Sequence, residues 1–443
     1  SAEISSYSGS GSTGAGGNIN LMVADTFSIL NNAQIIGGLL FGSGSKSSIT
    51  INALNLHMDN EASIRTRVFF GAAADINLNI ANTLSIRNDS VITASSFEQG
   101  DAGSINIAAG NLLVEGHVSS IESQTDGDGR GGNINLTIAD TLSLRNGGDI
   151  KTSSGFDKGD AGSISISARN LIIDGQGRLS SIASGTDGDG DGGDINLAVT
   201  ETLSLRNGGR ISAGAGGGIG GMKTGDAGAI TITADNLLVD AQGNIDSSLI
   251  ESTTSGAGLG GDINITVGDT LSLLNGGQII ASGAGMGDAG SVIVKAGQAV
   301  QITGGAYPIP INDTWVFPSG VFAQSLGMFF IDPGNAGDIT VTTPALTISD
   351  GGIIQAQSSF TSGGSLLINA ADLRLLNGGQ ISTSVFGDAT TTGGNVEINS
   401  RTVVALDGST VTAKATQGKG GNILVNTEAF FYDAASIDDV LNA

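Results

Sequence analysis

Three observations predict an all-β chain folded as a parallel β-helix, a solenoid of about fourteen triangular coils. A repeat of about thirty residues runs almost from end to end, apolar and polar residues alternate inside each copy, and Asn-Gly or Gly-Gly pairs separate the alternating runs. A fixed period of this length with period-2 alternation is typical of a stacked solenoid. One apolar position marks each copy and recurs at Ile19, Ile49, Ile76, Ile105, Ile134, Ile164, Ile195, Ile230, Ile263, Val292, Ile339, Leu366, Val396 and Ile423.

The copy at 131–160 shows the three short strands that we expect in every coil. A Gly-Gly corner precedes the first strand, and a second strand follows after Ala139-Asp140. The segment 146–148, Asn-Gly-Gly, then turns the chain, because Asn and Gly tolerate positive φ. A third strand and the loop 155–160 complete the coil. The expected inward side chains are Ile134, Leu136, Ile138, Leu142, Leu144, Ile150 and Thr152.

Other repeat folds fit these residues less well. No window shows the 3.6-residue spacing of a helical solenoid, and the 72 glycines would weaken helices. A propeller blade of four strands needs a longer period. The uninterrupted repeat therefore predicts one elongated domain over 1–443, with an aromatic- and Pro-rich insertion at 304–335 and a candidate C-terminal cap at 427–443.

A second period of about 59 residues lies on top of the first, because two types of coil alternate. One type carries TLSLRNGG, as at 141–148, and the other carries NLLVEG or NLIIDG, as at 111–116. By the strand alternation, the outward residue of the second strand is Ser in the first type and Leu113, Ile172 or Leu238 in the second. A row of large aliphatics on an outer face predicts a lateral interface that a loop or a neighbouring molecule covers.

Composition restricts the kind of partner. Apolar residues make up 39% of the chain, too many for a disordered Gly-rich polymer, and the formal net charge is −24. Such an acidic surface repels nucleic acid and anionic lipid and suits cation binding or a purely solvating role. The chain has no cysteine and no apolar run of membrane-spanning length. It begins at Ser1 without a basic-then-apolar leader, so we expect a mature or internal segment.

The alternating GG[N/D]IN[L/I], TLSLRNGG, GDAGSI and NLLVDG units resemble the repeat region of filamentous-haemagglutinin-like exoproteins, especially cyanobacterial members of the two-partner secretion family. The resemblance covers about 13–426 and includes FPSGVFAQS at 317–325. It implies a right-handed β-helix that an outer-membrane transporter exports, and an extracellular or cell-surface protein that is often an adhesin. The family's N-terminal secretion domain, with its Asn-Pro-Asn-Gly motif, has no counterpart here.

Two Asp/Gly loops are the candidate metal sites. Asp187, Asp189 and Asp191 alternate with glycine as in the first half of a calcium-binding loop, but Ala198 stands where such a loop has its bidentate Glu. Asp126 and Asp128 form a shorter copy of the motif. A weak calcium site and a solvated turn both fit this pattern, so calcium is the one cofactor that the sequence suggests.

The insertion at 304–335 is the candidate ligand-binding surface. It gathers the only Trp of an aromatic-poor chain with several Phe and Pro residues, and we expect Trp315, with Tyr307 or Phe317 beside it, to contact a glycan or protein. A flap packed over the corner of the solenoid fits the same composition. The two histidines, His57 and His117, have no partners at a ligand spacing and read as surface or turn residues.

We therefore expect a secreted, non-catalytic β-helical stalk at the cell surface, acting as an adhesin or structural protein toward a host or neighbouring-cell glycan or protein. A self-assembling filament or sheath subunit, stacked end to end or side by side, is the alternative, because open strand edges template pairing. A polysaccharide-active enzyme ranks below both, because no paired-Asp or His-centred motif of that chemistry occurs.

Overall fold

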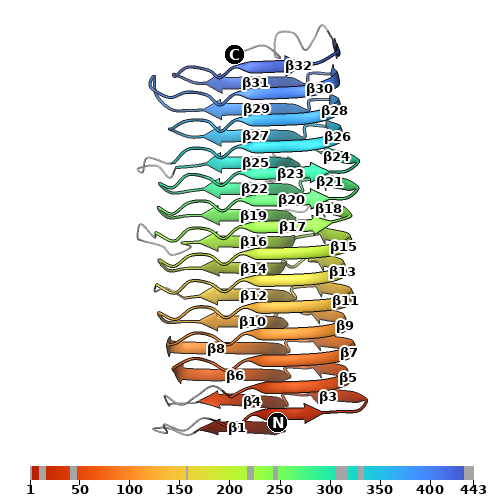
Figure 1. Cartoon of the computed structure of the whole chain (residues 1–443), viewed down its shortest axis with the longest axis vertical. Coiled ribbons are helices and arrows are strands. Elements are labelled where there is room, and N and C mark those ends of the chain that lie inside the picture. Colours follow the sequence, from red (N-terminus) through yellow and green to blue (C-terminus); the bar gives the residue numbers. More distant parts are fainter. Residues whose placement is uncertain are drawn as a thin grey trace. The chain divides into compact units, whose positions relative to one another are not determined.

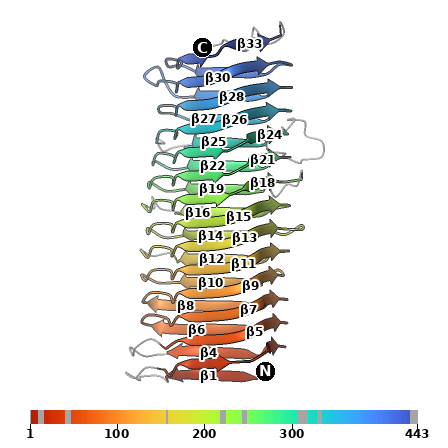
Figure 2. The ribbon, with the colours of Figure 1, turned by 45° about the vertical axis from the view of Figure 1, so that its right-hand side comes forward.

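The structure is a computed structural model that describes residues 2–8, 16–39, 47–155, 158–216, 224–242, 248–304, 318–327 and 334–433. The chain divides into two compact units. Unit 1 comprises Ser1–Glu201 and Arg210–Gly228, and unit 2 comprises Thr202–Gly209 and Ala229–Ala443. In both units the strands of successive coils lie one above another as parallel neighbours, which confirms the parallel β-helix (Figures 1 and 2).

Each coil presents three faces, which we number by the order of their strands. In unit 1 the first two faces are usually built by one long strand that bends. These strands are β2 (Ile19–Met22), β3 (Thr26–Leu30), β5 (Ile49–Asp59), β7 (Ile76–Arg87), β9 (Ile105–Glu115), β11 (Ile134–Arg145), β13 (Ile164–Asp174) and β15 (Ile195–Arg206), the last of which continues into unit 2. The third face of unit 1 consists of β1 (Glu3–Ser8), β4 (Gln34–Leu39), β6 (Ser63–Phe70), β8 (Val91–Gln99), β10 (Ser120–Thr125), β12 (Asp149–Ser154), β14 (Ser180–Thr186) and β16 (Gly209–Ala215).

Unit 2 has the same three faces, and several of its coils keep the first two strands separate. The first and second faces contain β17 (Ile230–Ala234), β18 (Asn236–Asp240), β20 (Ile263–Val267), β21 (Thr270–Leu274), β23 (Val292–Ala296), β24 (Ala299–Thr303), β26 (Ile339–Ser349), β28 (Leu366–Leu376), β30 (Val396–Ala405), β32 (Ile423–Asn426) and β33 (Ala429–Tyr432). The third face contains β19 (Leu249–Thr254), β22 (Gln278–Gly283), β25 (Gly320–Ser325), β27 (Ile353–Ser358), β29 (Gln380–Val385) and β31 (Thr410–Ala415).

The register stacks the repeat's marker position on itself. Ile134 pairs with Ile105 on one side and Ile164 on the other, and all three are fully buried. In unit 2, Ile263 likewise lies between Ile230 and Val292. The expected inward residues of coil 131–160 are at most 3% exposed, so the period-2 assignment is confirmed. Columns of buried side chains, most of them branched aliphatics, form the core of each unit.

In most coils of unit 1, the first two strands are more continuous than the sequence predicts. In β11 the pairing register shifts between Ile138 and Thr141, so the chain bends there without leaving the sheet. The Asn-Gly turn that follows agrees with the sequence, because Asn146 and Gly147 have φ values of 50° and 90°.

The corner before the first strand, which is Gly-Gly in some coils and Ala-Gly in others, has a different physical origin from that turn. A Cβ atom on Gly162 would lie 2.5 Å from the carbonyl carbon of Gly132 in the preceding coil. Inward hydroxyls of the third face bind these corner carbonyls, since Ser184 donates to Gly162 at 2.8 Å and Ser123 to Gly103 at 2.8 Å. The corner therefore requires glycine for close approach of backbones.

The proposed insertion is not one continuous loop. Residues 320–325 form β25, which pairs with β22 and β27, so this part of 304–335 belongs to the stack. Val321 and Ala323 point inward and are fully buried, and Phe322 is only 5% exposed. Gln278 of β22 donates to the carbonyl of Pro318 at 2.9 Å. The extra residues therefore fall on both sides of a regular third-face strand. The sequence analysis did not identify this strand, because its sequence differs from those of the other third-face strands.

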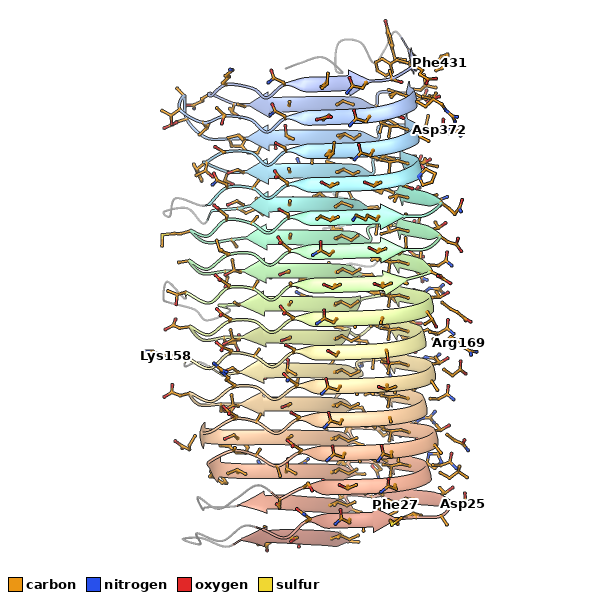
Figure 3. The ribbon with its side chains drawn as sticks, in the orientation of Figure 1. Asp25, Phe27, Lys158, Arg169, Asp372 and Phe431 are labelled. Atoms are coloured by element: carbon orange, nitrogen blue, oxygen red, sulfur yellow. The ribbon has the colours of Figure 1, made fainter. Side chains whose placement is uncertain are left out.

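The expected C-terminal cap also begins as a strand. Ala429–Tyr432 is β33, and it pairs with β30 as the next second-face strand of unit 2. The rings of Phe430 and Tyr432 lie 5.5 Å apart, and Phe431, labelled in Figure 3, is 58% exposed. Residues 434–443 of the proposed cap lie outside the described residues.

Candidate functional site

Rows of outward side chains are the features of the two units that a partner would meet. Asparagines on the first face hydrogen-bond from coil to coil, as Asn135 does to Asn106 and Asn106 to Asn77, at 2.9 Å in each case. The residue before the marker position forms a second ladder, in which Asn133 accepts the backbone N–H of Ser163 at 2.9 Å. These ladders satisfy polar groups within the stack and explain why Asn or Asp recurs at those positions in many of the coils.

Charges alternate along the end of the second face in unit 1. Arg87, Glu115, Arg145 and Asp174 occupy the same position in four successive coils. The Nε of Arg87 lies 3.5 Å from Oε2 of Glu115, with both side chains substantially exposed. The two-coil period therefore alternates the sign of a charge as well as side-chain size, and the sequence analysis missed this regularity. Exposed pairs of this kind contribute little stability individually.

A second ionic row lies at the bend between the first and second faces. Arg169, labelled in Figure 3, reaches Asp140 at 4.0 Å and Glu201 at 3.8 Å in the coils on either side. In unit 2, Asp372 accepts from Arg401 in the next coil at 3.2 Å. These contacts link neighbouring coils at their outer surface, where solvent screens them.

The proposed lateral residues occupy the outer column that the alternation predicts. Leu113, Ile172 and Leu238 point outward, and each is half-buried rather than fully exposed. Their register partners in the neighbouring coils are serines, as Ser143 is for both Leu113 and Ile172. Ser143 is only 6% exposed, which fits large side chains leaning over a small neighbour. Cover by a loop or a second molecule stays a prediction.

The first aspartate loop follows β14 and is tied into the stack by its last member. Asp191 donates its backbone N–H to Oδ1 of Asp160 at 3.0 Å, and its own Oδ1 accepts the N–H of Asp226 at 2.9 Å. Asp187 and Asp189 are exposed. Asp191 thus has a structural role that the calcium-loop pattern does not predict.

The second aspartate loop, with Asp126 and Asp128, follows β10. Arg130 stands at the position of the third acid, and its Nε lies 3.4 Å from Oδ2 of Asp160 in the next coil. Across the part of the chain that the structure describes, no group of three or more His, Cys, Asp or Glu side chains has a metal-binding arrangement. Calcium binding at either loop stays a prediction.

The other residues singled out from the sequence are the aromatics of the insertion and the two histidines. Tyr307, Trp315 and Phe317 lie outside the described residues. His57 is half-buried in β5, and its Nδ1 lies 2.9 Å from the hydroxyl of Ser85 in the next coil. His117 is exposed in a turn. Both histidines therefore occupy surface or turn positions, as expected.

A cluster that the sequence analysis missed lies on the third face of unit 1. Arg65, Arg67 and Phe69 alternate outward along β6, and Phe97 projects from β8 beside them. The rings of Phe69 and Phe97 stack with centroids 5.2 Å apart, and Cζ of Arg67 lies 5.0 Å from the centroid of Phe97. The alternation in SIRTRVFF at 63–70 was the available signal, and only the coil register reveals Phe97 as its neighbour.

Burial affects this cluster electrostatically. The Nε of Arg65 is buried and has no hydrogen-bond partner among the described residues. Burial lowers the pKa of Arg65 below its usual value, the nearby Arg67 lowers it further, and Glu122 opposes the shift. Glu122 is itself paired with Lys151 at 3.0 Å. The two arginines form no ion pair within the described residues.

Within the described ranges, no helix is long and apolar enough to cross a bilayer. Comparisons with protein-family models, with curated proteins and with solved structures found no match to this chain.

Proposed function

We propose that the chain is the repeat region of a filamentous-haemagglutinin-like exoprotein, exported through an outer-membrane transporter. It serves as a secreted, non-catalytic β-helical stalk at the cell surface, where it acts as an adhesin or a structural protein. The observation that carries the proposal is the regular stack in each unit. A solenoid repeats the same outward columns coil after coil, which suits contact with an extended glycan or protein partner.

The residue chemistry supports this function. The core columns are branched aliphatics, and the outward rows are ladders of Asn, Asp and Ser with exposed ion pairs between coils. These polar side chains bond from one coil to the next and together form a polar surface. The net charge of −24 helps to keep a protein with such a surface in solution. This use of polar groups fits a stalk better than an enzyme, whose reacting groups converge at one point.

The test is location and adhesion in the source organism. Antibodies against the chain should label intact cells or the culture medium, and a brief protease treatment of intact cells should remove the cell-bound label. Beads coated with the full chain should bind partner cells more than beads coated with an unrelated acidic protein. Label that appears only after cell lysis would contradict the proposal.

The second candidate is a self-assembling filament. The outward column of Leu113, Ile172 and Leu238 supports it, because a row of large aliphatic side chains suits side-by-side contact between copies of the chain. Negative-stain electron microscopy of the purified chain separates the two functions, since a filament subunit should give fibres whose length grows with concentration.

A further inference from the structure

The arginine–phenylalanine cluster on β6 and β8 is distinctive in its charge. The protein carries 42 acidic and 18 basic residues, yet Arg65 and Arg67 project from the same face of one strand, two residues apart. Two residues of a strand span about 6.6 Å, so the guanidinium groups repel each other within a Debye length. Such a pair is stabilised when an anion lies between its members.

The cluster also fixes one of the two cations in place. Arg67 lies against the ring of Phe97, which in turn stacks on Phe69, so an aromatic surface holds this guanidinium. Arg65 pairs in register with Thr93 of β8, and Arg67 pairs with Ser95. The Thr93 hydroxyl, two rings and two arginines without an ion pair among the described residues therefore share one surface, which Glu122, paired with Lys151, borders beside Thr93.

We propose that the surface formed by Arg65, Arg67, Phe69, Thr93 and Phe97 binds an anionic saccharide, whose carboxylate or sulfate is held by the two guanidinium groups. Planar guanidinium groups match both anions with paired hydrogen bonds. The C–H groups of a sugar ring pack against phenylalanine, and sugar hydroxyls match Thr93. The inference names a ligand class for the proposed surface protein, and it rests on that function only for its biological setting.

A second copy of the chain is the competing occupant, because its exposed aspartate loops carry the opposite charge. Those loops consist mainly of Asp and Gly, as at 187–193, and offer no apolar group to pack against Phe69 and Phe97. A saccharide supplies both an apolar ring face and an anion, so the combination of rings and arginines favours it.

The experiment measures binding of the full chain to three immobilised polysaccharides: polygalacturonate, which carries carboxylates, dextran sulfate, and neutral dextran. The test variant is Arg65→Gln/Arg67→Gln, and Phe97→Leu is a second variant that keeps the charge. The matched control is Lys158→Gln/Arg178→Gln, which removes two exposed cations from loops of unit 1 (Lys158 is labelled in Figure 3). Both double variants change the net charge equally, and circular dichroism checks that each remains folded.

We expect the wild type and the control to bind one or both anionic polymers and not dextran. The arginine variant should lose about tenfold or more in affinity, because it removes charge-assisted hydrogen bonds. Phe97→Leu should weaken binding of the same polymer, and the preferred polymer identifies the anion as carboxylate or sulfate. Equal losses in the two double variants, equal binding of dextran, or no binding of either anionic polymer would overturn the inference. Concentration-dependent dimerisation that only the arginine variant abolishes would assign the surface to a second copy. None of these outcomes bears on where the protein is located, so the proposed function is tested separately.

Discussion

Replacing Gly162 by alanine tests the physical basis of the coil corner. The new Cβ would lie 2.5 Å from the carbonyl carbon of Gly132, about 1 Å closer than the ordinary contact of ~3.5 Å. The coils must separate locally, which strains the bond from Thr152 Oγ1 to the Gly162 carbonyl and the bond from Gly131 N–H to Asp160 at 2.8 Å. Overpacking costs about 1–3 kcal/mol and each weakened hydrogen bond about 1 kcal/mol, so we expect a loss of about 3–5 kcal/mol.

Gly185→Ala is the matched control in the same unit. The three atoms nearest to its Cβ would all belong to Gly214, with the carbonyl oxygen at 3.1 Å and the next atom at 3.7 Å. Both substitutions reduce the entropy of the unfolded chain equally, so this contribution cancels in the comparison. Urea unfolding followed by circular dichroism measures the stability, and hydrogen exchange over β11 and β13 locates the loss, because a solenoid need not unfold in one step. Equal unfolding midpoints for the two variants would refute the close-approach explanation.

Three further predictions concern calcium, the insertion and pH. If the first aspartate loop binds calcium, chelation should lower the melting temperature of the wild type but not that of a variant with Asn at 187, 189 and 191. Calorimetry should then show millimolar affinity for calcium. If calorimetry detects no heat of binding at several millimolar calcium, the loop is only a solvated turn. Deleting 306–316, which spares β25, should weaken binding to partner cells and leave both thermal unfolding and polysaccharide binding at the surface of β6 and β8 nearly unchanged. An unfolded variant would identify a structural flap instead. Burial raises the pKa of Asp149, although Ser181 donates hydrogen bonds to its carboxylate at 2.8 and 2.9 Å. Ionised Asp149 therefore destabilises the folded protein at pH values above the raised pKa. This destabilisation disappears below the pKa of an Asp in the unfolded chain. Asp149→Asn should therefore stabilise the protein at neutral pH, and urea midpoints of the two proteins should converge as the pH falls below about 4.

The sequence predicted the fold because the same local pattern recurs in every coil. One marker residue per coil, such as Ile134, was enough to predict both the strand face and the inter-coil register, and the structure confirms both. The turn at Asn146 was predictable from residue chemistry alone. The continuity of the first two strands was not, because Ala139-Asp140 interrupts the apolar alternation and so marks a break between two strands in the sequence.

The functional surfaces were harder to predict for a physical reason. A column brings together residues that lie about thirty positions apart, so Phe97 meets Arg67 only once the register is known. The alternation of Ser with Leu or Ile on the second strand was visible in the sequence. The alternation of charge, as between Arg87 and Glu115, becomes meaningful only once the coil register shows that these side chains lie next to each other. The motif that resembles a calcium loop did not reveal that Oδ1 of Asp191 accepts the backbone N–H of Asp226 in the next coil. Residue types alone do not show such a structural role.

The central claim is that successive coils stack in parallel and in register, and electron spin resonance tests it most directly. The chain has no cysteine, so a cysteine introduced at a chosen position can be labelled with a nitroxide without competing thiols. Ala108, Thr137 and Ser167 are exposed and occupy one outer column in three successive coils of unit 1. Their backbones should lie about 5 Å apart for Ala108 and Thr137 and about 10 Å apart for Ala108 and Ser167. Strong dipolar broadening for the first pair and weaker, still measurable broadening for the second are the predicted result. Absence of broadening in the first pair, or stronger broadening in the second, would contradict the parallel stack.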